Sequence, residues 1–73
     1  MGEGNKEIFL FESSTHVLWA EEMAEEAGIP VAVISAPAET RNSCGLAVQT
    51  YSEKAPAFMD LLNEEGIPFS RYA

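Results

Sequence analysis

Glu25-Glu26-Ala27-Gly28-Ile29-Pro30-Val31 in the first half of the chain is echoed by Asn63-Glu64-Glu65-Gly66-Ile67-Pro68-Phe69 in the second half. In each copy the glycine is suited to end a helix, because it adopts positive φ without a Cβ clash. The proline that follows is suited to the start of a strand, because it cannot donate to a sheet ladder. The echo predicts that each half of the 73-residue chain is one β-α-β unit.

Two helices are predicted to precede the two glycines. Residues 16–27 have helical periodicity, and the four glutamates of this segment fall outside its apolar stripe. Three candidate N-caps, Ser13-Ser14-Thr15, come just before it. The second helix begins near Ser52 or Ala55, carries a proline in its first turn and turns Phe58, Leu61 and Leu62 inward. The apolar stripe of the first helix is Val17, Ala20, Ala24 and Ala27.

Four strands are predicted, over residues 7–12, 29–35, 45–51 and 67–72. The order βαββαβ is that of an α+β ferredoxin-like sandwich, with a four-stranded antiparallel sheet and two helices on one face. In this plan the second and fourth strands are the edges, which agrees with the proline at the start of each. We expect residues 1–73 to form a single domain, with residues 1–6 as a disordered N-terminus.

Helices on one face leave the other face of the sheet without cover. Strand side chains alternate, so either Ile8 and Leu10 or Phe9 and Phe11 must lie on the helix-free face. An exposed apolar patch of that kind marks a contact surface. We therefore predict a homodimer through the sheet, or a partner protein that covers it.

Composition excludes several classes of function. The chain has 12 acidic and 4 basic residues and a formal net charge of -8, which argues against binding to nucleic acid or to an anionic membrane. It has no apolar run long enough to span a bilayer. A single cysteine fits a reducing compartment, so we expect a cytoplasmic protein. No glycine-rich phosphate loop, paired-carboxylate motif or set of metal ligands is present, and we expect no cofactor and no metal.

Cys44 has two interpretations. Free cysteine commonly behaves as a small buried hydrophobic residue, here at the start of a strand. Alternatively it is a working loop thiol, made reachable by Gly45 and preceded by Ser43, with Arg41 close enough in sequence to favour the thiolate. These four residues form the candidate site.

A Cys–His pair within one chain is not expected. We place the loop of Cys44 at the end of the sheet where both helices finish, and His16 at the start of the first helix. About eleven helical residues would then separate them by roughly 16 Å. The negative ends of helix dipoles would also oppose a thiolate, so Cys44 is not expected to be a hydrolase nucleophile.

The sequence also resembles a known family. Phe11, Ser13-Ser14-Thr15-His16, the glutamate-rich helix that ends in Ala-Gly-Ile-Pro, and Pro37 followed by Ser43-Cys44-Gly45-Leu46-Ala47 are similar to the selenium/sulfur carrier-like proteins of bacteria and archaea. The resemblance covers nearly the whole chain and implies that Cys44 is the carrier residue. That family usually has a basic residue directly after the proline, where this chain has Ala38.

The resemblance implies a carrier rather than an enzyme. Cys44 would accept a sulfane sulfur or selenium from a donor protein such as a desulfurase, and pass it to an acceptor enzyme. The alternative is a non-catalytic ligand-binding or protein-interaction module, because the ferredoxin-like fold hosts many functions. A further alternative is a redox-sensing thiol that forms an intermolecular disulfide.

Overall fold

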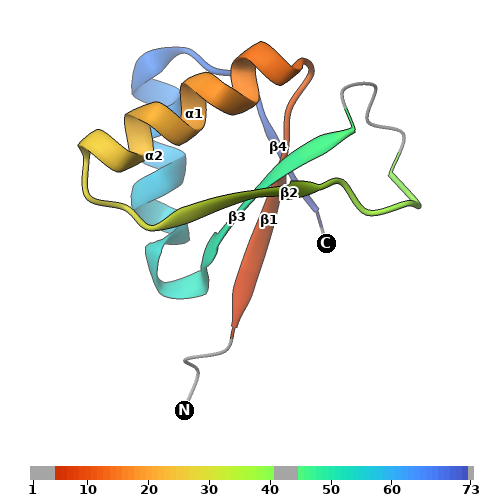
Figure 1. Cartoon of the computed structure of the whole chain (residues 1–73). Coiled ribbons are helices and arrows are strands. Elements are labelled where there is room, and N and C mark those ends of the chain that lie inside the picture. The colour runs from red at the N-terminus through yellow and green to blue at the C-terminus, as the bar shows by residue number, and fades with distance from the viewer. Residues whose placement is uncertain (1–4, 41–44, 73) are drawn as a thin grey trace.

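The computed structural model describes residues 5–40 and 45–72 and has the predicted βαββαβ order. Its two helices lie together on one face of a four-stranded antiparallel sheet (Figure 1). The fold is therefore the α+β ferredoxin-like sandwich expected from the sequence. A 3-10 turn, η1 (Ser52–Lys54), precedes the second helix. The elements are β1 (Lys6–Leu10), α1 (Ser14–Glu26), β2 (Val31–Ser35), β3 (Leu46–Tyr51), α2 (Ala55–Glu65) and β4 (Ser70–Tyr72).

The strand order is β2-β3-β1-β4, so the predicted edge strands are confirmed. β3 pairs with β1 through Phe9↔Val48, and with β2 through Val33↔Val48. β4 pairs with the other side of β1. Pro30 stands immediately before one edge strand and Pro68 two residues before the other, where a missing N–H leaves the ladder intact.

Both copies of the echoed motif form the same helix cap. Ile29 N donates to Ala24 O at 2.8 Å, and Ile67 N donates to Leu62 O at 2.9 Å. The residue before each isoleucine is a glycine with φ of 79° at Gly28 and 75° at Gly66. This is the hydrogen-bond pattern of a Schellman cap, which needs a left-handed residue in that place.

The caps explain why two strands begin later than predicted. The N–H groups of Ile29 and Ile67 bond to helix carbonyls, so neither residue can join a ladder. β2 therefore starts at Val31, and β4 is only three residues long. Both isoleucines are instead buried in the core.

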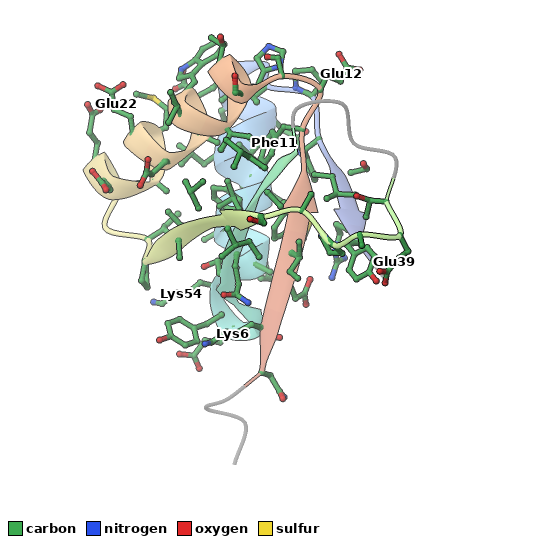
Figure 2. All side chains as sticks on the ribbon, turned by 45° about the vertical axis from the view of Figure 1, so that its right-hand side comes forward. Lys6, Phe11, Glu12, Glu22, Glu39 and Lys54 are labelled. Atoms are coloured by element: carbon green, nitrogen blue, oxygen red, sulfur yellow. The ribbon has the colours of Figure 1, made fainter. Side chains whose placement is uncertain are left out.

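The core lies between the helices and the sheet. Phe9 of β1 is fully buried, and its ring meets Phe58 of α2 edge-on, with 5.1 Å between the ring centroids. It also contacts Phe69, at 5.7 Å. Phe11 extends the same row beneath the helices (Figure 2). Phe9 and Phe11 therefore face the helices, and Ile8 and Leu10 lie on the helix-free face.

Residues 5 and 6 contact the sheet, although the sequence predicts them as part of a disordered N-terminus. Lys6 belongs to β1, pairs with Tyr51, and holds its Nζ 5.7 Å from the centroid of that ring. Asn5 O accepts a hydrogen bond from Ser52 N at 3.1 Å. These contacts order residues 5 and 6, which we had assigned to a disordered N-terminus.

Gly66→Ala tests the cap. The position has open space around it, so the cost comes only from forcing a Cβ into the left-handed region. We expect a loss of about 1–2 kcal/mol in the free energy of unfolding, measured by urea denaturation. Glu64→Ala, an exposed change two residues away, should stay within about 0.5 kcal/mol of the parent chain. Equal losses in the two variants would contradict this account of the cap.

Candidate functional site

The loop between β2 and β3 carries the candidate site, and its base is a continuation of the sheet. Ala36 N donates to Gly45 O at 3.0 Å, which adds one more pair to the β2–β3 register. Gly45 is exposed and has φ of 72°, a value that L side chains rarely adopt. The two ends of the loop are therefore held together, and the chain turns sharply at Gly45.

Only one of the four predicted site residues lies in the described part of the chain. Gly45 is at the loop base, as set out above. Arg41, Ser43 and Cys44 lie outside the described residues. The exposure of the thiol and its relation to Arg41 stay predictions.

The first half of the loop is a tight turn. Pro37 O accepts from Thr40 N at 3.0 Å and from Thr40 Oγ1 at 2.8 Å. Two bonds on one carbonyl hold residues 37–40 in a fixed shape. This turn determines where the side chain of Glu39 points.

Glu39 is tied to the far edge of the sheet. Its carboxylate accepts a hydrogen bond from the hydroxyl of Tyr72 in β4, and Figure 2 shows Glu39 beside that strand. Tyr72 pairs with Ile8, so its side chain lies on the helix-free face. The bond therefore joins a loop that leaves one edge strand to the other edge strand, across this face.

The helix-free face of the sheet is more buried than a bare apolar face would be. Ile8, Leu10 and Ile34 are half-buried, and Ala47 between them is fully buried although it lies outside the helix-side core. Ala47 pairs with Leu10 on one side and Ile34 on the other. The helix-free face is therefore less exposed than the strand pattern indicated.

The loop is not at the end of the sheet where we predicted it. β2 runs parallel to β1, since both are antiparallel to β3, so β2 ends where β1 ends and α1 begins. α2 finishes at this same end (Figure 1). The prediction that both helices finish at this end is therefore correct for α2 and wrong for α1, which begins here.

This correction removes the distance argument against a Cys–His pair. His16 is in the first turn of α1, where Ser13 Oγ accepts from its N–H at 3.3 Å. Its ring lies beside Trp19, and its Nδ1 is buried with no hydrogen-bond partner among residues 5–40 and 45–72. The electrostatic objection also weakens, because the partial charge at the start of α1 is positive and only α2 contributes a negative end.

The comparisons with known proteins assign the chain to a family. A family model described as "Putative Se/S carrier protein-like" matches residues 6–73. The chain belongs to this family. No curated protein and no solved structure matches the chain.

The described residues of this Se/S carrier-like chain show neither a cluster of metal ligands nor a membrane-spanning helix. No group of three or more His, Cys, Asp or Glu side chains in those residues is arranged to hold a metal ion. No helix there is long and apolar enough to cross a membrane.

Sequence reasoning missed the residues that position the loop. Glu39 reads as an ordinary loop acid, and Tyr72 stands near the end of a short strand. They are 33 residues apart in sequence and on opposite edges of the sheet. Strand periodicity assigns Tyr72 to a face, but no local pattern indicates what its hydroxyl will meet.

Tyr72→Phe tests the hydrogen bond between Tyr72 and Glu39 in this Se/S carrier-like chain. Loss of the hydroxyl should release Glu39 and raise the rate of amide hydrogen exchange at Thr40. We expect about fivefold faster exchange, equivalent to about 1 kcal/mol. Tyr51→Phe, on the same face but outside this contact, is the control and should leave Thr40 exchange unchanged. If both variants exchange like the parent chain, the bond does not hold the turn.

Proposed function

We propose that this chain is a carrier that accepts sulfur or selenium on Cys44 and passes it on. Two observations support the proposal. The family model covers residues 6–73 and describes a Se/S carrier-like protein. Gly45, the residue covalently bonded to Cys44, is exposed and anchored to Ala36. Cys44 is therefore covalently bonded to a residue that is open to solvent and held at the base of the loop.

The transfer is a thiol exchange and requires no resident cofactor. The Cys44 thiolate attacks the outer sulfur of a donor persulfide, and the sulfur–sulfur bond of the donor breaks. The donor leaves as a thiolate and Cys44 becomes a persulfide, with no net oxidation. A nucleophile on the acceptor then attacks the outer sulfur of the Cys44 persulfide. The sulfur–sulfur bond breaks, the outer sulfur is transferred to the acceptor, and Cys44 leaves as a thiolate. Selenium follows the same path from a selenopersulfide donor.

The residues near Cys44 have supporting roles in this proposal. Arg41 favours the thiolate by its charge, and takes the place of the basic residue that the family usually has at Ala38. Ser43 is able to donate to the sulfur, and Gly45 leaves room for a second protein to approach. The chemistry of each step then belongs to the partner enzyme, so the chain is a carrier rather than an enzyme.

The carrier role requires partners that this chain does not supply. A desulfurase-type protein provides the persulfide, and a second enzyme consumes it. Loading requires Cys44 as a reduced thiol, which is consistent with a cytoplasmic location. The half-buried apolar residues of the helix-free face provide a surface for a homodimer.

The direct test loads the chain and locates the added atom. The reduced chain is incubated with a cysteine desulfurase and cysteine, then analysed by intact mass spectrometry and peptide mapping. We expect a product heavier by one sulfur atom, with the addition on Cys44 and reversed by a reductant. Cys44→Ser should take up none. A parent chain that stays unmodified would overturn the carrier proposal, and full biological activity of Cys44→Ser would favour the non-catalytic binding module.

The homodimer is tested separately by sedimentation equilibrium. If two copies pair through the helix-free face, Ile34→Lys places a cation in the contact and should weaken dimerisation at least about tenfold, because the charge loses water on association. Asn63→Lys, an exposed change in α2 on the other side of the sheet, adds the same charge away from this face and is the control, which should change dimerisation little. A parent chain that remains monomeric at high micromolar concentration would contradict the dimer and leave the carrier role intact.

A further inference from the structure

The outer edge of β2 offers free backbone groups. The bond from Ala36 N to Gly45 O makes residues 36 and 45 a hydrogen-bonded pair, and such pairs alternate along an antiparallel ladder. Residues 34 and 32 therefore bond to β3. The N–H and C=O groups of Val31, Val33 and Ser35 point the other way, where the described sheet has no further strand. β2 is thus able to pair with one more strand.

The two edges of this sheet differ in protection. β4 is three residues long, follows Pro68, and carries Arg71, which forms an ion pair with Glu7. Both edge strands follow a proline, but a strand that is short and carries a charge is the poorer template for pairing. β2 has five residues, Val31–Ser35, and none of them is charged. Natural sheets seldom leave an uncharged apolar edge of this kind open unless it has a use.

A negative flank of α1 lies above the open edge. α1 packs against β2 and β3, and its buried stripe is Val17, Ala20 and Ala24. Glu21 and Glu25 are one helical turn apart on the same side of that stripe. Because the β1-α1-β2 crossover is right-handed, this side faces the outer edge of β2 and the opposite side faces α2. Glu21 is half-buried and Glu25 is exposed, as expected for a flank.

We propose that β2 receives an extended basic segment of a partner protein as a fifth strand of the sheet. The backbone of the segment pairs with Val31, Val33 and Ser35, and its Lys or Arg side chains on the helix side meet Glu21 and Glu25. The inference rests on the proposed function, since it identifies where a sulfur donor or acceptor binds. β2 continues directly into the loop of Cys44, so a strand added here brings the partner to the start of that loop.

Charge favours a basic partner over a second copy of this chain. Each chain carries a formal charge of -8. Pairing β2 with β2 of another copy about a two-fold axis would bring Glu21 and Glu25 of both chains to the same edge. Like charges so placed repel, whereas lysines or arginines would be attracted to the same flank.

The test uses the full chain and a defined probe, the peptide acetyl-Lys-Val-Lys-Val-Lys-amide, titrated by NMR. Its lysines share one face, so they meet the α1 flank when the peptide pairs with β2. We expect saturable shifts of the amide signals of Val31, Val33 and Ser35. The same peptide with glutamates in place of lysines should not bind. A peptide N-methylated at alternate residues keeps its charge but cannot complete the ladder, and it should not shift these amides.

Two double variants separate local charge from net charge. Glu21→Gln with Glu25→Gln should weaken the basic peptide roughly three- to tenfold, because two ion pairs are lost. Glu22→Gln with Glu26→Gln removes the same charge from the exposed face of α1 that points away from the sheet, and should change affinity less than about twofold. Equal losses in both double variants would overturn the proposal. Shifts confined to β4, unaltered binding of the N-methylated peptide, or a dimer that protects the β2 amides would also overturn it.

The outcome is independent of sulfur loading. Cys44→Ser should bind the peptide as the parent chain does, because the strand site lies on β2. Binding at β2 with no sulfur uptake on Cys44 would disprove the carrier role but leave the strand site standing. Sulfur uptake on Cys44 with no peptide binding would disprove the strand site but leave the carrier role standing.

Discussion

Two helix-terminating hydrogen bonds determine most of this structure. The bonds from Ile29 N to Ala24 O and from Ile67 N to Leu62 O end α1 and α2 in the same way. Each turns the chain through a left-handed glycine and buries the isoleucine that follows. A proline follows each isoleucine. Because proline cannot donate to a ladder, the strand that follows each helix is suited to an edge of the sheet. The strand order then follows from one local device used twice.

The site loop depends on this arrangement. Since β2 is an edge strand and β3 is central, the connection between them leaves the sheet at one edge and returns beside its middle. Ala36 and Gly45 close the base of the loop, and Glu39 fixes its first half to Tyr72 at the opposite edge. The loop is therefore supported at two points that are distant in sequence.

Local patterns predicted the elements, and long-range contacts decided the rest. The order of elements, the edge strands and most of the inward face of α1 were readable, because glycine, proline and helical spacing act within a few residues. Ala27, which the spacing also predicts on that face, is the C-cap of α1 and is exposed. The late start of β4 could not be predicted, because it depends on the Ile67 N–H, which bonds to the carbonyl of Leu62 in α2 and not to a neighbouring strand. The Glu39–Tyr72 tie had no local signal at all. The position of the β2–β3 loop relative to α1 could have been predicted correctly, since it follows from the strand directions alone. Of the candidate site, only Gly45 is described, so Cys44 rests on motif and family.

The difference between the two edge strands has a consequence for self-association. A sheet with two equally receptive edges can add copies head to tail without limit, and the product is a filament. Here the ion pair of Arg71 with Glu7 and the shortness of β4 close one edge. A copy that docked on β2 would have to use its own β2, because its β4 is a poor template. Both open edges would then be occupied, so growth would stop at two copies. A small acidic chain with an internally repeated design thereby avoids polymerisation while one of its edges stays open.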